Sequence, residues 1–172
     1  DLSVMAPKPL VPLDFGIHHL GSSSHSNLSF KLKVGDDILA NSMIISLNSP
    51  VIDELTTHLH QSSIGVEDFA RDAVQCFAEA CYSGEVEKLS KSNFRDVNKM
   101  AHVFEVSWLV TRCDSFFKSI TDELTEECCE DIMYVFEEAV FKMTALKKND
   151  FVKLIIEKLS STAKYCQSVI AA

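Results

Sequence analysis

Histidine and cysteine are the residues of this chain best suited to bind a metal or to act as nucleophiles, and the chain has six of each. The histidines that lie close in sequence are His18-His19 and His58 with His60. No cysteine lies near either pair, and neither pair has the spacing of a zinc site. Cys128 and Cys129 are adjacent, so on a helix they point to different sides and cannot hold one ion together. We therefore predict no metal site.

Other patterns that would indicate catalysis are sparse. A cysteine–histidine nucleophile pair meets only in space, so the sequence leaves that alternative open. The five glycines are scattered and form no phosphate-binding loop, so we predict no cofactor. The acidic run at residues 126–131 is typical of a solvated helix face. We predict that the chain is not an enzyme.

The composition indicates an acidic domain with ample material for a core. The chain has 172 residues, of which 47% are hydrophobic and 11 are Phe. Its net charge of −9 lacks the basic surface that nucleic acid or an anionic membrane attracts, so we predict neither partner. No apolar run is long enough to cross a bilayer. Since the chain begins at Asp1 and not at Met, we expect it to be part of a longer protein.

Four of the six cysteines fall at or near apolar positions of predicted helices, namely Cys76, Cys81, Cys113 and Cys128. Reduced thiols behave there as small apolar residues, whereas a disulfide framework is the alternative. Free buried thiols are typical of proteins that work in a reducing compartment. We therefore expect the protein to be cytoplasmic, with the nucleus as a second location.

The first part of the chain reads as a leader followed by a small sheet. Residues 1–27 are rich in Pro and Ser, which excludes a stable helix. Apolar and polar residues then alternate over residues 28–34, and after the turn at Gly35-Asp36-Asp37 a second strand returns over residues 38–40. Residues 41–47 predict a short helix, and Pro50 suits the first position of the next one. Residues 62–68 predict a third strand.

Three helices are predicted over residues 68–120. The first has one apolar face, made by Ala73, Val74, Phe77, Ala78 and Cys81. Gly84 suits the left-handed residue that ends a helix, and Ser90 or Ser92 is placed to cap the next helix. That second helix has an apolar face of Val97, Met100, Ala101 and Phe104. The third has a face of Leu109, Cys113, Phe116 and Ile120, with Trp108 and Phe117 beside it.

This order of elements resembles a BTB/POZ domain over residues 28–120. The most specific matches are Tyr82-Ser83-Gly84-Glu85, Asn93-Phe94, and Leu109-Val110 followed by Cys113 and Phe116. Residues 121–172 continue in helical periodicity and resemble the first helices of a BACK domain. The resemblance implies an α+β, mostly helical fold, in which a three-stranded sheet has flanking helices and BACK-like helices follow.

The resemblance also implies a function. BTB domains are protein-interaction modules, many form homodimers, and many of those followed by BACK bind a cullin scaffold as substrate adaptors of a ubiquitin ligase. The family's cullin-contact motif aligns on Leu59-His60-Gln61, and we predict contact there, with Phe104 and Trp108 as additions. A buried, structural role is the alternative for Trp108. The substrate would be held by parts of the protein beyond this chain.

The chain departs from the family pattern in ways that keep a second function open. Asn27 replaces an Asp, Asn41-Ser42 replaces a His-Lys pair, and Gln61 replaces the Glu of the cullin motif. The first two positions line a polar pocket at the dimer centre in the family, so no ion-pair network is expected there. The Pro-rich leader stands where dimeric adaptors carry a helix, which predicts weakened dimerisation. The alternative function is a scaffold or oligomerisation domain without a ligase, in assembly or transcriptional repression.

Overall fold

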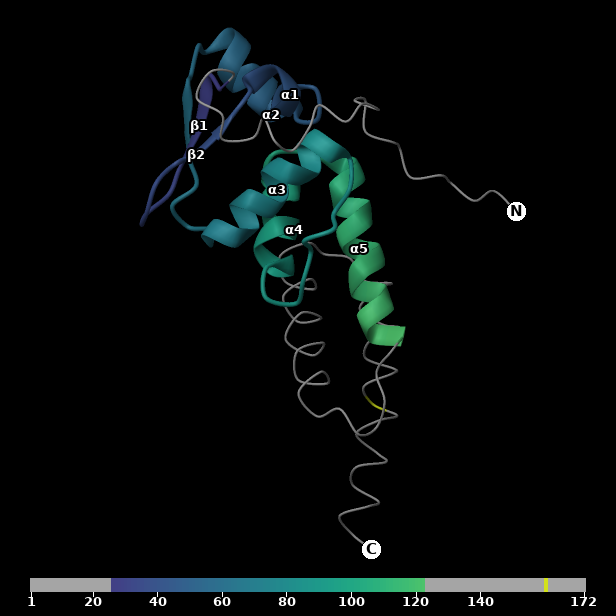
Figure 1. Cartoon of the computed structure of the whole chain (residues 1–172). Coiled ribbons are helices and arrows are strands. Elements are labelled where there is room, and N and C mark those ends of the chain that lie inside the picture. The colour runs from purple at the N-terminus through teal and green to yellow at the C-terminus, as the bar shows by residue number, and fades with distance from the viewer. Residues whose placement is uncertain (1–25, 123–159, 161–172) are drawn as a thin grey trace, which may run out of the picture. The chain divides into compact units, whose positions relative to one another are not determined.

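The computed structural model describes residues 26–122 and Ser160 (Figure 1). Most of the predicted leader and the BACK-like helices of residues 121–172 therefore lie outside the described residues and stay predictions. The chain divides into two compact units, Asp1–Cys113 and Asp114–Ala172.

The sheet has three strands, as the sequence predicts, in the order β2-β1-β3. They are β1 (Leu28–Lys31), β2 (Ile38–Ala40) and β3 (Ser63–Gly65). β1 pairs antiparallel with β2 and parallel with β3, which places Ile38 and Ile64 on either side of Phe30. The strands lie at the left of Figure 1, with α3 beside them.

Two strands are shorter than predicted. β1 ends at Lys31 and not at residue 34, and Val34 is 81% exposed because the chain has already turned toward Gly35. β3 ends at Gly65 and not at residue 68, because the Phe69 amide donates to the Val66 carbonyl over 3.1 Å and closes a turn. Alternation of apolar residues therefore continued past the residues that pair in the sheet.

Two short helices follow the hairpin, α1 (Ser42–Ser46) and α2 (Pro50–Asp53), and α2 continues as the π-helix η2 (Glu54–His58). Asn41 caps α1 by accepting a hydrogen bond from the Met43 amide. Ser49 caps α2 by accepting one from the Ile52 amide, and Pro50 is the first helical residue, as predicted.

The long helices are α3 (Arg71–Ser83), α4 (Phe94–Val103) and α5 (Ser107–Asp122). Gly84 ends α3 with φ of 73°, which confirms the predicted left-handed residue. The predicted cap of α4 by Ser90 or Ser92 is wrong. Asn93 precedes α4, and its side chain accepts from the Ser90 amide and donates to the Lys88 carbonyl. The two serine hydroxyls are bonded to each other.

The buried face of α5 differs from the prediction at one position. Leu109, Cys113 and Phe117 are fully buried, whereas Phe116 is half-buried. The buried residues follow a spacing of four, and the predicted face had shifted to a spacing of three after Cys113. Phe117 therefore takes the place that the sequence assigned to Phe116.

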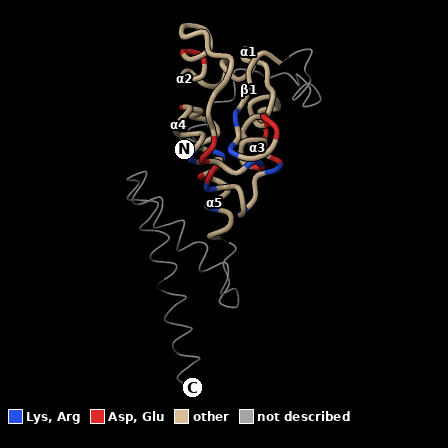
Figure 2. Tube along the Cα trace, turned by 90° about the vertical axis from the view of Figure 1, so that its left-hand side faces the viewer, with Lys and Arg blue, Asp and Glu red and all other residues tan. Residues whose placement is uncertain are grey.

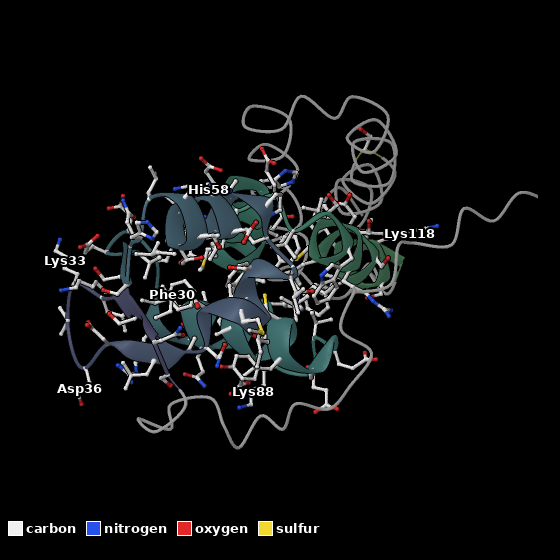
Figure 3. The ribbon with its side chains drawn as sticks, turned by 90° about the horizontal axis from the view of Figure 1, so that it is seen from above. Phe30, Lys33, Asp36, His58, Lys88 and Lys118 are labelled. Atoms are coloured by element: carbon white, nitrogen blue, oxygen red, sulfur yellow. The ribbon has the colours of Figure 1, made fainter. Side chains whose placement is uncertain are left out.

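An aromatic chain holds the sheet to the helices. Phe30 points from β1 into the interior (Figure 3) and meets the Phe77 ring of α3 edge-on, with centroids 6.3 Å apart. Phe77 in turn packs against Phe104, at the end of α4, at 5.5 Å. All three rings are at most 5% exposed. Their burial accounts for a large share of the hydrophobic stabilisation, since aromatic side chains bury the most area.

Candidate protein-interaction site

The loop of Leu59, His60 and Gln61 lies at the surface directly after η2. Leu59 is 58% exposed, and His60 and Gln61 are exposed as well. The backbone of the loop is nevertheless fixed, because the Leu59 amide donates to the Glu54 carbonyl and the Gln61 amide to the Leu55 carbonyl. The structure therefore brings three of the five predicted contact residues together, with their side chains available to a partner.

The π-helix before this loop has a cause in the sequence. The Thr56 hydroxyl donates to the Ile52 carbonyl over 2.8 Å and also lies 3.1 Å from the Ser46 hydroxyl. A hydroxyl on a helix carbonyl competes with the regular backbone ladder and widens or bends it. Wide π turns often mark functional positions.

His60 adopts a left-handed backbone conformation with φ of 53°, which residues other than Gly usually avoid. Such a residue costs about 1 kcal/mol and is held in place by its surroundings. Here the bonds of the neighbouring Leu59 and Gln61 amides enforce it. The turn at His60 separates the exposed Leu59 from the start of β3.

Phe104 and Trp108, predicted as additional contacts, lie in the core instead. They are 5% and 6% exposed, which leaves them little surface to offer a partner. The ring of Phe104 packs on Phe77, and the indole of Trp108 donates to Asn48 over 3.1 Å. Trp108 is therefore buried, as the alternative of a structural role predicts.

Asn48 and Ser49 are important positions that the sequence showed only as a turn. The buried Asn48 amide donates to the carbonyls of Ile44 and Cys81 and accepts from Trp108, so it links α1, α3 and α5. The buried Ser49 hydroxyl donates to the Phe104 carbonyl over 2.6 Å while it caps α2. These bonds fix α2 and η2, and hence the Leu59 loop, on the rest of the domain. Most of the groups to which Asn48 and Ser49 bond are distant in sequence and come close only in the folded domain.

The surface of α1 is a second candidate for contact. No residue from Ile38 to Ile52 is charged, and Figure 2 shows α1 without acidic or basic positions. Met43 is 71% and Leu47 45% exposed. Both line a groove of about 350 Å³ whose other residues are Ser42, Ser46, Asp53, Thr56 and Thr57. Exposed apolar side chains that gather in this way are typical of surfaces that bind proteins.

The model of the BTB/POZ domain family matches residues 20–121. The chain belongs to the BTB/POZ family. Among solved structures, the BTB domain of human gigaxonin is similar at 21% sequence identity and a TM-score of 0.46, covering 55% of this chain and 79% of that one. No curated protein matches the chain. The fold is a BTB fold, and the chain is a protein-interaction domain.

Two of the positions at which this BTB domain departs from its family touch each other. The Asn27 amide donates to the Ser42 hydroxyl over 2.9 Å, and the Ser42 backbone amide donates to the Asn27 side chain over 2.7 Å. A neutral pair thus stands where the family pattern has charged residues. Its hydrogen bonds are independent of pH over the range in which carboxylates and histidines titrate.

Two of the described thiols of this BTB domain, those of Cys76 and Cys81, are poor nucleophiles. Burial, with help from Glu79 and Asp72, raises the pKa of Cys76 to about 11, and burial also raises the pKa of Cys81. The thiolate is the reactive form, so both thiols are nearly inert at neutral pH. Glu79 itself is buried, and it accepts from Lys88 at 2.7 Å and from Gln75 at 2.8 Å. The protonated thiols of Cys76 and Cys81 and the hydrogen-bonded carboxylate of Glu79 are therefore expected to stabilise the fold and not to take part in catalysis.

Among the described residues 26–122, no group of three His, Cys, Asp or Glu side chains is placed to hold a metal ion. Over the same residues, no helix is long and apolar enough to span a bilayer.

Proposed function

We propose that this BTB domain belongs to an adaptor that joins a cullin scaffold to a substrate held by other parts of the protein. The observation that carries the proposal is the loop of Leu59, His60 and Gln61, where the family's cullin-contact motif aligns. Its apolar residue is exposed and its backbone is fixed before any partner arrives. The reduced, buried thiols support work in the cytoplasm or the nucleus.

The contact would combine one apolar anchor with one polar group. Burying an exposed Leu side chain is worth about 1.5–3 kcal/mol, and Leu59 has more than half of its surface available. Gln61 would add a neutral hydrogen bond of about 1 kcal/mol and fix the register of the partner. Because the loop is already ordered, little conformational entropy is lost on binding.

The test is calorimetric titration of a cullin N-terminal domain into the chain and its Leu59→Asp variant. The substitution removes the anchor and introduces a charge, so affinity should fall at least about tenfold. Val34→Asp is the matched control, because Val34 is also an exposed apolar residue but lies in the β1–β2 turn. Equal affinity for Leu59→Asp and the unchanged chain, or an equal loss with Val34→Asp, would refute the assignment of this loop.

The second candidate is a scaffold or oligomerisation domain that engages no ligase. It is favoured by Gln61 in place of Glu, and by the neutral Asn27–Ser42 pair. The variant Gln61→Glu separates the two functions. A charged acceptor forms a stronger hydrogen bond than a neutral one by about 1 kcal/mol, so the adaptor predicts roughly five- to tenfold tighter cullin binding. The scaffold predicts no binding by either form.

Homodimerisation is also part of the proposal, in a weakened form. The family's usual dimer centre carries a neutral pair here, and the leader is rich in Pro. Light scattering should therefore give less than the dimer mass at low micromolar concentration. A full dimer mass there would contradict this part of the proposal.

A further inference from the structure

The outer edge of β3 has backbone groups that the domain itself does not use. β3 bonds to β1 through the Ser62 carbonyl and the Val66 amide, both over 2.9 Å, with Ile64 between them. In a parallel ladder, alternate residues face the neighbouring strand, so Ser63 and Gly65 direct their N–H and C=O groups away from β1. Within residues 26–122 these groups have no hydrogen-bond partner.

This edge also lacks the protection that sheet edges commonly have. Gly65 is exposed, Ser63 is half-buried, and the flanking Gln61 and Glu67 are exposed. The strand contains no Pro, no Lys and no bulge, which are the usual devices against pairing with another chain. Ser63 and Gly65 are small, and the side chain that lies over Gly65 is the flexible one of Glu67, whose Oε2 is 2.8 Å from the position that a Cβ would take. A second strand could therefore approach this edge once the Glu67 side chain turns aside. In Figure 1, β3 runs at the outer left of the sheet.

We propose that a second copy of this chain binds here by pairing β3 with β3 in antiparallel order, centred on Ile64. Ser63 of each copy would then face Gly65 of the other. The two-fold symmetry gives two such pairs, and each pair would exchange two backbone hydrogen bonds. Every outward N–H and C=O group of β3 is satisfied in this register. The two sheets join into one continuous sheet around a two-fold axis.

The side chains beside the strand favour a second copy over an unrelated peptide. In this register Gln61 of each copy lies just beyond one end of the paired strands, on the side where the other copy turns at Glu67, so an amide lies near a carboxylate at both ends. Like charges meet nowhere along residues 61–67, since Glu67 is the only charged residue of that segment. Self-complementarity of this kind is the requirement for a two-fold interface, because the same patch must serve both partners.

Sedimentation equilibrium of the 172-residue chain, from about 10 µM to about 1 mM, tests the proposal. The contact is small, so the average mass should rise only in the upper part of that range. Gly65→Pro should weaken the association at least about tenfold, because it removes an outward donor and places a ring on the edge. Within the described residues the substitution removes no backbone hydrogen bond. Glu67 Oε2 lies 2.8 Å from the position of the added Cβ, so the flexible Glu67 side chain must turn aside to accommodate the ring.

A charge variant keeps the test decisive if Gly65→Pro does not fold. Gln61→Lys places a cation near the Glu67 carboxylate of the other copy at the end of the paired strands and should tighten the association about threefold. Adding Glu67→Lys should reverse that gain. Gln61→Glu should weaken it, although the same variant strengthens cullin binding in the function proposed above, so the two proposals can fail separately. A constant mass up to 1 mM would overturn the inference. So would an association that none of these variants changes.

Discussion

The substitution Asn48→Ala should destabilise the domain far more than its place in a short turn suggests. Asn48 is 8% exposed, and its side-chain amide makes three hydrogen bonds, to the carbonyls of Ile44 and Cys81 and from the indole of Trp108. A neutral hydrogen bond contributes about 1 kcal/mol net, and a buried group left without its partner costs about 1 kcal/mol more. The expected loss is about 3–4 kcal/mol, a large part of the stability of a domain this size.

Urea unfolding followed by fluorescence measures this loss directly. Trp108 is the only Trp of the chain and is itself one of the partners, so its emission reports both unfolding and the local change. Asn27→Ala is the matched control, because it removes an exposed amide that bonds only to Ser42 among these contacts. The control should cost less than about 1 kcal/mol. Equal losses for the two variants would refute the role assigned to Asn48.

Three further predictions concern stability. Gly84→Ala should cost about 1 kcal/mol in thermal unfolding, because φ is 73° there, and an unchanged Tm would contradict the left-handed end of α3. Tyr82→Phe should lower the free energy of unfolding in urea by about 1 kcal/mol, because the Tyr82 hydroxyl accepts from the Asn41 backbone amide over 2.7 Å. An unchanged free energy of unfolding would mean that water replaces the hydroxyl as the partner of that amide. Stability should also fall above pH 9. An unfolded thiol loses its proton near pH 9.0, whereas folded Cys76 keeps its proton to about 11, so the contribution of thiol burial is complete below pH 9 and is lost as the pH rises toward 11. Cys76→Ala should flatten this decline, and an unchanged pH profile would count against the buried thiol.

Much of the fold could be predicted from local patterns. The hairpin, the third strand and the helices follow from alternation and from helical periodicity, and the glycine that ends α3 follows from its position after the last apolar residues. The ends of β1 and β3 were less predictable. Val34 shares the alternation of β1 but has no strand to pair with, since pairing depends on the turn and not on hydrophobicity.

The candidate site was predictable only in part. The position of Leu59, His60 and Gln61 came from the family resemblance, and the structure adds that Leu59 is exposed on a fixed loop. The π-helix was not predicted, because it depends on where the Thr56 hydroxyl finds a carbonyl. The burial of Phe104 was visible in helical periodicity, which had already placed it on the apolar face of α4.

Long-range polar contacts lay beyond any local pattern. The bond between Asn48 and Trp108 spans 60 residues, and that between Ser49 and Phe104 spans 55. An Asn-Ser pair before Pro fits a turn equally well with or without such partners. The apolar surface of α1 was missed for a related reason. A short helix with Met43 and Leu47 reads as core until the packing shows which of its faces is covered.

The central claim is that this BTB domain binds a cullin scaffold, and calorimetric titration of the chain with a cullin N-terminal domain tests it most directly. A cullin adaptor should show saturable binding with a Kd of about 10 µM or tighter, since one anchored Leu and a fixed loop add to the remaining contacts of the interface. No heat of binding at tens of micromolar protein would contradict the claim. The scaffold function would then become the better explanation of this surface.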